Sequence, residues 1–175
     1  MSINERELFR NTIRNSKHYF EFGAGGSTYF ACSIPSIISI TSVESDTIYI
    51  NKIQQLCPRA NILFANIGPT KKWGYPIVNT YNWSNYYNMW DKRPVEPDTV
   101  LIDGRFRVAC ALTIILTSNP LIIIHDFLNR TQYHILLDFF DIVKSIDTLV
   151  LIKRKNDITT EYINSVLQNY ITVPD

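Results

Sequence analysis

The chain has 175 residues, of which 46% are hydrophobic and 19% are charged, so it can bury a sizeable core and is not a disordered composition. Its 17 basic and 16 acidic side chains give a net charge of +1. A nucleic acid is therefore not an expected partner, because such a partner requires a basic stripe or patch. The length suits one domain over residues 1–175.

Membrane attachment and secretion are not expected. The N-terminal residues MSINEREL are polar and charged, so we expect no signal peptide. The apolar stretch 109–127 contains Thr, Ser, Asn and Pro, and so predicts a helix, a turn and a buried strand rather than a membrane span. We therefore expect a cytoplasmic protein.

The cysteines Cys32, Cys57 and Cys110 are odd in number and lack the spacing of a metal site. We interpret them as buried or free thiols, as is usual in a reducing compartment.

The first part of the chain predicts an alternation of helices and strands. Leu8, Phe9 and Ile13 lie on one side of an opening helix. The expected elements are a helix over 4–16, a strand over 18–22, a helix beginning over 27–32, a strand over 37–45, a helix over 46–57 and a strand over 61–67. Asp46 is the expected N-cap of the third helix, and Pro58 follows its end.

Residues 68–97 interrupt this alternation, since they hold several glycines and prolines and all three tryptophans. A loop of this length inside a compact domain is usually functional or disordered, and its aromatic side chains need a surface to cover. We interpret it as an insertion that forms a lid over a substrate, packs over the sheet edge or makes a contact in a homodimer.

The second part of the chain resumes the alternation. The expected elements are a strand over 98–104, a helix over 105–118, a strand over 121–126, a helix over 129–138 and a last helix over 157–170. Residues 139–155 predict two strands around a turn near 145–147, with a helix through residue 144 as the alternative. The order indicates an α/β fold with a mostly parallel sheet, helices on both faces and one antiparallel strand near the C-terminus.

Polar residues follow the apolar bodies of the five predicted parallel strands. They are Glu21, Glu44, Asn66, Asp103 and the pair His125–Asp126. In open α/β sheets, ligands bind beyond the carboxyl ends of the strands, so these residues are candidates for one site.

The stretch YFEFGAGGST, residues 19–28, places glycines directly behind the first strand. Gly23 and Gly25 allow the backbone to approach a ligand, but the dinucleotide pattern would need a third glycine where Thr28 stands. Glu44 follows Gly23 by 21 residues, a spacing at which a carboxylate can accept hydrogen bonds from ribose hydroxyls. The loop is either a cofactor loop or a tight turn, and Glu44 favours the first.

With these residues in place, the chain resembles the class I S-adenosylmethionine-dependent methyltransferases. The matching segments are EFGAGGST (21–28), SVESD (42–46) and VLIDG (100–104), and DIVKSIDTLVLIKRK (141–155) is similar to the reversed strand of that family. The resemblance covers roughly residues 17–155 and implies a Rossmann-like methyltransferase fold.

The resemblance also implies S-adenosylmethionine as cofactor and a pose for it. The methionine part and the sugar would lie along the loop residues Glu21, Gly23, Ala24, Gly25, Ser27 and Thr28. Glu44 would bind the ribose, Asn66 and Ile67 would flank the adenine, and Asp103 would face the methionine end. The family often has an acidic residue near position 66, where this chain has Asn66.

Candidate catalytic residues follow the fourth and fifth strands: Asp103, Arg105, His125 and Asp126. His125 is the best general base by residue type, because its free pKa lies near neutrality. The alternative is that it only caps the strand end. Candidates for binding an acceptor are Arg107, Arg130, Tyr133 and Trp73. Arginines could bind a carboxylate or phosphate, or could simply pair with the nearby aspartates.

Some methyltransferases of the family use a divalent metal bound by carboxylates and an amide. Asp103, Asp126 and Asn129 could imitate that set, but Asp126 and Asn129 are not adjacent as in the family, and we expect no metal.

We therefore expect a methyltransferase that acts on a small-molecule or saccharide-like acceptor, at oxygen. The alternatives are a non-catalytic relative that serves as a binding or interaction protein, and a nucleotide-dependent oxidoreductase.

Overall fold

The computed structural model describes residues 1–78 and 82–175. Within these residues a seven-stranded sheet has the order β3-β2-β1-β6-β7-β9-β8, and a two-stranded sheet joins β4 and β5. The strands are β1 (His18–Phe22), β2 (Ser39–Glu44), β3 (Asn61–Phe64), β4 (Thr70–Lys71), β5 (Tyr75–Pro76), β6 (Thr99–Ile102), β7 (Leu121–Ile124), β8 (Phe140–Ile146) and β9 (Leu149–Arg154). Strand β9 runs antiparallel to both neighbours, and the other pairings in the large sheet are parallel. The predicted α/β fold is confirmed.

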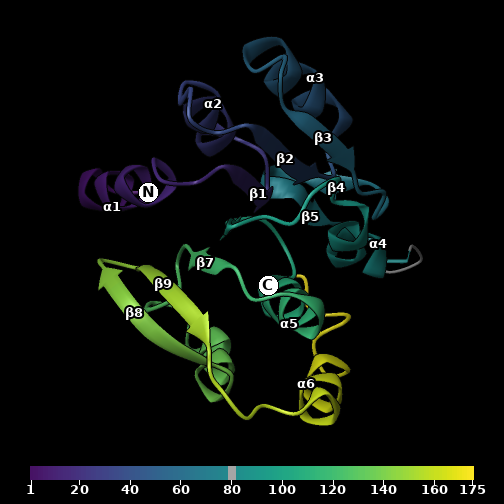
Figure 1. Cartoon of the computed structure of the whole chain (residues 1–175). Coiled ribbons are helices and arrows are strands. Elements are labelled where there is room, and N and C mark those ends of the chain that lie inside the picture. Colours follow the sequence, from purple (N-terminus) through teal and green to yellow (C-terminus); the bar gives the residue numbers. More distant parts are fainter. Residues whose placement is uncertain (79–81) are drawn as a thin grey trace.

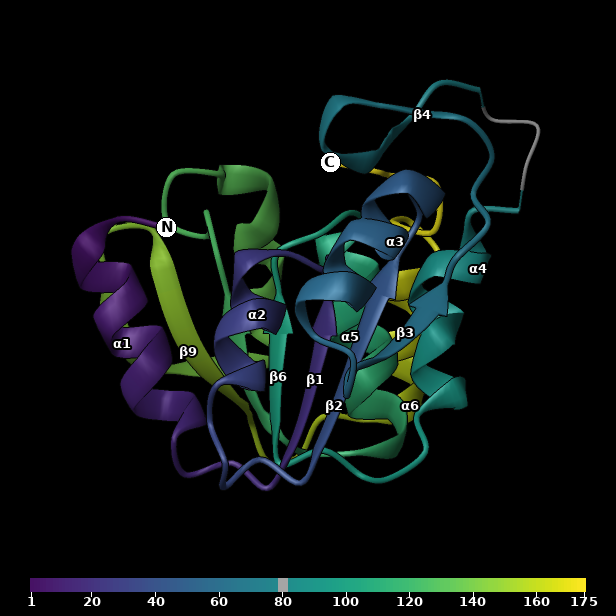
Figure 2. The same ribbon diagram turned by 90° about the horizontal axis from the view of Figure 1, so that it is seen from above.

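The helices lie in two layers around this sheet. They are α1 (Ile3–Ile13), α2 (Gly26–Cys32), α3 (Thr47–Leu56), α4 (Ser84–Tyr87), α5 (Arg107–Thr117) and α6 (Thr160–Leu167), with 3-10 turns η1 (Lys72–Gly74), η2 (Asn88–Lys92) and η3 (Thr131–Asp138). Helices α1, α2 and α3 cover one face of the sheet, and α4, α5 and α6 cover the other (Figures 1 and 2).

The strand sequences are apolar without alternation because both faces are covered. In β6, Val100 and Ile102 pack on the side of α5, whereas Leu101 packs on the side of α1 and α2. Strand β7 repeats the pattern, with Ile123 on the side of α1 and its neighbours on the other. Each strand therefore contributes to two hydrophobic cores.

Most predicted elements are present, with shorter ends. Asp46 caps α3 as expected, since its carboxylate accepts from the backbone N–H groups of Ile48 and Tyr49. The hairpin of β8 and β9 is present in place of the alternative helix. The helix expected over 129–138 is wrong in type, because Thr131–Asp138 forms a 3-10 turn.

The interrupted region 68–97 has two parts with different roles. Residues 70–76 form the small hairpin of β4 and β5, which is clearly separated from the sheet in Figure 2. Helix α4 and turn η2 instead pack into the core, where Trp90 is fully buried against Phe20. Part of the expected insertion, 79–81, lies outside the described residues.

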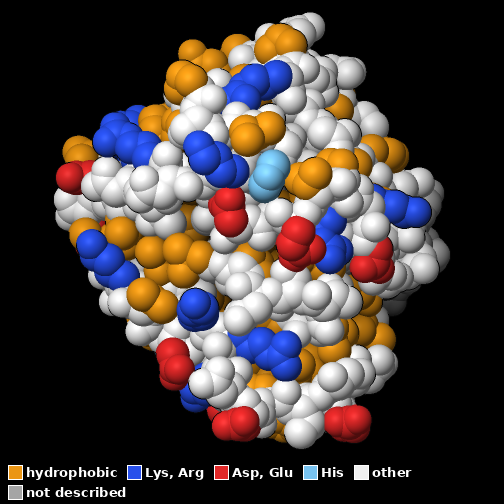
Figure 3. Space-filling model, viewed as in Figure 1, with side chains coloured by type: hydrophobic (Ala, Val, Ile, Leu, Met, Phe, Trp, Pro, Cys, Tyr) orange, Lys and Arg blue, Asp and Glu red, His pale blue; other side chains and the backbone are white. Residues whose placement is uncertain are grey.

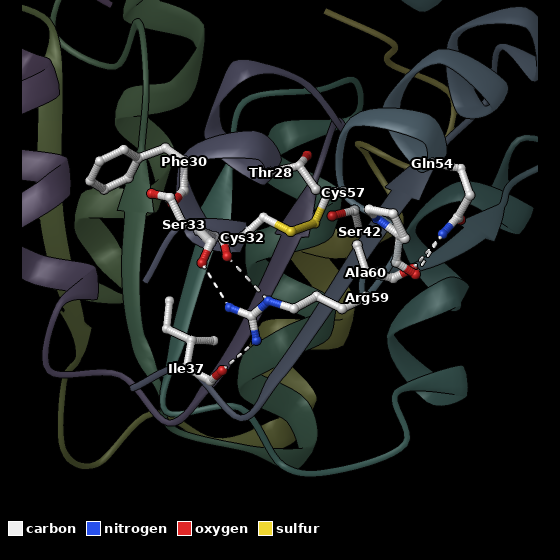
Figure 4. Close-up of a disulfide and its surroundings, with 12 residues drawn as sticks. Thr28, Phe30, Cys32, Ser33, Ile37, Ser42, Gln54, Cys57, Arg59 and Ala60 are labelled. Carbon is white, nitrogen blue, oxygen red and sulfur yellow. Dashed lines mark hydrogen bonds between the residues drawn. A yellow bond between two sulfur atoms is a disulfide. The ribbon is translucent and has the colours of Figure 1, made fainter. Parts of the chain in front are cut away.

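The interpretation of all three cysteines as thiols is wrong for two of them. Cys32 and Cys57 form a disulfide that joins the C-terminal ends of α2 and α3, with Cα atoms 5.8 Å apart (Figure 4). Arg59 braces the same corner, donating to the carbonyls of Cys32 and Ile37. The two cysteines are 25 positions apart in the sequence, and their contact arises only when α2 and α3 pack on the sheet. Cys110 is a buried free thiol as expected.

Among the described residues, no helix is both long and apolar enough to cross a membrane. The face seen in Figure 3 mixes basic, acidic and hydrophobic side chains, and no single sign of charge dominates it.

Candidate functional site

A cavity of about 1150 Å³ lies where the parallel strands reach their carboxyl ends. Its walls come from the glycine loop after β1, the end of β2, the hairpin of β4 and β5, the ends of β6 and β7, and helix α1. The site predicted from the strand ends is therefore a single space, large enough for more than one small ligand.

The glycine loop is held in a conformation that requires glycine at its first position. Gly23 has φ +98°, and a Cβ atom there would lie 2.7 Å from the Cα of Gly104. The N–H of Gly23 donates to the carbonyl of Val43 at 2.9 Å. Gly23, Ala24, Gly25 and Ser27 all line the cavity, as expected for a loop that approaches a ligand.

Glu21 and Thr28, predicted to contact the cofactor, lie beneath the loop instead. Glu21 is fully buried, and its carboxylate accepts from Thr28, Ser42 and Tyr19. The N–H of Gly25 in turn donates to Thr28 Oγ1 at 2.8 Å. Burial raises the pKa of Glu21, despite the hydrogen bonds that oppose the shift. These two side chains hold the loop from below and do not line the cavity.

Glu44 lines the cavity at the end of β2. Its Oε1 accepts from the backbone N–H groups of Ser45 and Asp46 at 2.7 and 3.0 Å. Among the described residues, every hydrogen bond to this carboxylate ends on Oε1, which leaves Oε2 for a ligand. Burial raises the pKa of Glu44, against the hydrogen bonds from the backbone N–H groups of Asp46 and Ser45, which lower it.

The structure does not bring Asn66 and Ile67 to the cavity. Asn66 is exposed, and its Oδ1 accepts from the N–H of Gly68 at 3.1 Å. Ile67 is fully buried in the core on the side of α5. Tyr49, from α3, lines the cavity instead. Sequence spacing predicted the strand end correctly but not which side chains face the ligand space.

His125 lies between two carboxylates. Its Nδ1 is 2.9 Å from Asp103 Oδ1, and its Nε2 is 3.3 Å from Glu5 Oε2. Burial alone would lower the pKa of His125, but the hydrogen bond to Asp103 and the charges of Asp103 and Asp126 outweigh it and raise the pKa. A ring in this position favours the protonated state, in which both N–H groups donate.

The sequence does not indicate Glu5 as a site residue, because nothing in its position on the first helix predicts that its side chain is buried. It is 3% exposed, and Thr148 donates to it from its N–H and its hydroxyl. Burial would raise its pKa, but the hydrogen bonds from Thr148 and Ser2 outweigh that effect and lower the pKa from 4.5 to about 2. Glu5 therefore links α1 to the end of β7.

Arg107 is a buried cross-link between strand ends and not a surface arginine. It is 2% exposed, and its Nη2 lies 3.5 Å from Asp103 and 3.4 Å from Asp126. It also donates to the carbonyls of Gly104 and His125. Its charge is thus already compensated by the protein.

Arg130 and Tyr133 form the outer part of this network. Arg130 donates to Asp126 at 3.1 Å and to the Tyr133 hydroxyl at 3.2 Å. Tyr133 is fully buried and does not line the cavity, whereas Arg130 does. The alternative in which these arginines pair with the aspartates fits this arrangement best.

Arg105 and Trp73 lie near the hairpin of β4 and β5. Arg105 donates to the carbonyl of Asp175, and its guanidinium lies 6.0 Å from the ring of Tyr75. Trp73 is 83% exposed at the tip, with φ +66°. Gly74 brings the hairpin close to Glu44, since a Cβ there would lie 3.9 Å from Glu44 Oε1. The hairpin forms one wall of the cavity.

Oxygen and nitrogen atoms of Asp103, His125 and Asp126 lie within 4.8 Å of one another, close enough for a metal ion. The guanidinium of Arg107 already lies beside both aspartates, and His125 favours its protonated state. A divalent cation would have to displace these positive groups, so the donor set does not fit one well. Asn129, the third candidate ligand, is exposed and does not line the cavity.

Comparison with family models and with curated proteins found no match. Solved structures do match. A methyltransferase-like protein from Silicibacter pomeroyi DSS-3 is 28% identical, with a TM-score of 0.87 over 99% of this chain and 96% of that chain.

More distant solved structures share the fold. A putative caffeoyl-CoA O-methyltransferase from Staphylococcus aureus is 16% identical, with a TM-score of 0.59 over 89% of this chain and 85% of its own. The N-methyltransferase NodS from Bradyrhizobium japonicum WM9, in complex with S-adenosyl-L-homocysteine, is 11% identical, with a TM-score of 0.52 over 88% of this chain and 86% of its own.

Proposed function

Because the chain has the fold of the class I S-adenosylmethionine-dependent methyltransferases, we propose that its cavity binds S-adenosylmethionine and that the protein transfers the methyl group to an oxygen of a small acceptor. The observation that carries this proposal is the carboxylate of Glu44. It lines the cavity, it is fixed through Oε1 by two backbone N–H groups, and its Oε2 is left for the hydroxyls of a ribose.

The glycine loop supports the same pose. Gly23 to Ser27 follow β1 along the cavity wall, so their backbone can lie against the amino-acid part of the cofactor. Asp103 lines the cavity on the next strand and would face that part from the other side. Glu21 and Thr28 act beneath the loop, where they hold its shape and need no contact with the cofactor.

S-adenosylmethionine supplies the methyl group, on a sulfonium sulfur, when it is bound. This chain then has to hold the acceptor oxygen in line with that group, exclude water and receive the proton of the acceptor hydroxyl. The side chains within reach of the proton are Asp103 and His125, which share a hydrogen bond. With His125 protonated, Asp103 is the better acceptor of the two.

The acceptor is a small molecule, for which the cavity has room beside the cofactor. Tyr75 and Trp73 on the hairpin present aromatic surface, which suits a flat or sugar-like acceptor.

The test is calorimetric titration of S-adenosylhomocysteine into the wild type, Glu44→Ala and the control Glu7→Gln. Glu7 is an exposed carboxylate of α1 that does not line the cavity. Losing a charged hydrogen-bond acceptor weakens binding by about 1.5–3 kcal/mol, roughly 10- to 150-fold. We expect that loss in Glu44→Ala alone.

The other outcomes separate the alternatives. If the wild type does not bind S-adenosylhomocysteine, the proposal is wrong, and NADH titration then tests the nucleotide-dependent oxidoreductase. If binding occurs but no acceptor is methylated, the protein is a binding relative of these enzymes.

A further inference from the structure

Helices α1 and α2 lie side by side on one face of the sheet, and the side chains between them line the cavity (Figures 1 and 2). The groove between α1 and α2 is lined by Arg6, Phe9, Arg10, Phe30 and Ser33. The rings of Phe9 and Phe30 are 6.1 Å apart, and Figure 4 shows Phe30 directed away from the disulfide toward α1. The groove therefore has an apolar floor and two cations on one wall.

Both arginines are already oriented. Arg6 Nε donates to the carbonyl of Ser2 at 3.2 Å, which leaves its two terminal nitrogens free of that bond. The guanidinium carbon of Arg10 lies over the Phe30 ring, 4.6 Å from its centre, which is within cation–π distance. Guanidinium groups held in this way lose little entropy when they bind an oxyanion.

Arg10 has a cation–π contact with Phe30, but neither arginine has a carboxylate partner in the described part of the chain. The ion pairs among the described residues involve neither Arg6 nor Arg10. Arg6 and Arg10 are four residues apart on α1, and like charges at this spacing destabilise a helix. An external anion would remove that repulsion.

The carboxylates elsewhere on the cavity wall do not neutralise Arg6 and Arg10, because they already have other partners. Among the described residues, seven lysines and arginines and four acidic side chains line the cavity. Asp103 and Asp126 face Arg107 and Arg130, while Glu44 and Asp46 accept from backbone N–H groups. The positive charge of Arg6 and Arg10 is left without a compensating carboxylate from the cavity wall.

The groove also begins at the reacting centre. Glu5, the residue before Arg6, contacts His125, and His125 contacts Asp103. From Glu5 to Arg10 the helix rises about 8 Å, at 1.5 Å per residue. A ligand that starts at Asp103 and follows the groove therefore passes His125 and Glu5 before it reaches the two arginines.

We propose that the groove between α1 and α2 is the acceptor subsite, and that it takes an elongated acceptor whose oxyanion, a carboxylate or a phosphate, is bound by Arg6 and Arg10. This rests on the proposed function, since it assigns the acceptor of the same reaction. The hydroxyl to be methylated lies at Asp103, the apolar body lies on Phe9 and Phe30, and the oxyanion lies at the far end. Arg107 and Arg130, which the sequence offers as candidates for binding an anion, pair with the aspartates instead.

The experiment measures probe binding by calorimetry to protein saturated with S-adenosylhomocysteine. The probes are 4-hydroxycinnamate, its neutral primary amide, and the phosphate monoester of 4-hydroxyphenylethanol. The variants are Arg6→Gln/Arg10→Gln and the control Arg14→Gln, which removes an arginine that follows α1 and does not line the cavity.

We expect the carboxylate or the phosphate to bind the wild type at least 10-fold more tightly than the amide. The double variant should lose that preference, and Arg14→Gln should keep it. Whichever anion binds more tightly identifies the oxyanion. Affinity for S-adenosylhomocysteine should change by less than 2-fold in all variants.

Equal binding of acid and amide, no binding of either anion, or a double variant that behaves like Arg14→Gln would each overturn the subsite. These results are distinct from failure of the proposed function, in which the wild type would not bind S-adenosylhomocysteine in the first titration.

Discussion

The two ends of the cavity hold their carboxylates in different ways. At the cofactor end, Glu21 and Glu44 accept hydrogen bonds from hydroxyls and backbone N–H groups, all of them neutral. At the acceptor end, Asp103 and Asp126 face the guanidinium of Arg107 and the ring of His125.

The cofactor end therefore depends on backbone geometry, whereas the acceptor end depends on the balance of charges. Neutral hydrogen bonds fix the cofactor loop in one geometry and leave a carboxylate oxygen for the ribose, so changes of backbone shape should affect this end most. The charged network compensates itself, so it should respond to pH and to loss of one partner. The following predictions test this contrast.

The largest effect is expected from Gly23→Ala at the cofactor end. The new methyl group would meet the backbone of Gly104, and φ +98° is strained for any L-residue with a side chain. We expect a loss of about 4 kcal/mol in the free energy of unfolding, from strain and overpacking together. Urea denaturation measures it.

Gly26→Ala is the matched control, because a Cβ there meets no atom within 4 Å. It should leave stability within about 0.5 kcal/mol of the wild type. Equal losses of unfolding free energy in Gly23→Ala and Gly26→Ala would show that close packing of the glycine loop against Gly104, after β6, does not stabilise the cofactor end.

The disulfide should give the next effect, at the C-terminal ends of α2 and α3, the helices that follow the cofactor strands β1 and β2. Cys32→Ser/Cys57→Ser opens a loop whose ends are 25 residues apart, which is worth about 3 kcal/mol. Thermal unfolding with and without dithiothreitol measures it: the wild type should be destabilised by the reductant, and the double variant should not respond. Hydrogen exchange should increase mainly in α2 and α3. A wild type that ignores the reductant would contradict the prediction.

At the acceptor end, Glu5 should make stability depend on acid. Its pKa is lowered from 4.5 to about 2, so the stability it contributes is present above pH 4.5 and is lost as the pH falls toward 2. Between pH 5 and pH 3 this amounts to about 2 kcal/mol, which should be missing from the pH dependence of Glu5→Gln. His125 stays protonated over this range, because its pKa is raised.

Urea denaturation at pH 5, 4 and 3 gives the slopes for the wild type, Glu5→Gln and the exposed control Glu7→Gln. The control should follow the wild type. Parallel slopes for the wild type and Glu5→Gln would show that the contacts of Glu5 carry no pH dependence.

The fold could be predicted because its signals are local. Apolar strands, a capping aspartate and glycines behind β1 each depend on neighbours in sequence, and together they determine the order of elements. The 3-10 turn at Thr131–Asp138 could not be predicted in this way, because tertiary contacts override a helical pattern.

The site was predicted only as far as the strand ends. Glu44 and Asp103 follow directly from them, since carboxyl ends of parallel strands meet at one edge. Glu5 and the Cys32–Cys57 pair depend on how α1, α2 and α3 pack on the sheet, which sequence spacing does not reveal. Only the family resemblance assigns Asn66 and Ile67 to the adenine. Strand β3 ends at Phe64, so the strand pattern does not determine in which direction these two later side chains point.

A crystal structure with S-adenosylhomocysteine tests most directly whether Glu44 anchors the cofactor. We expect ribose hydroxyls within hydrogen-bond distance of Glu44 Oε2, and the homocysteine part along Gly23–Ser27 with its sulfur directed toward Asp103. A ligand bound outside this cavity, or one whose ribose makes no contact with Glu44, would contradict it.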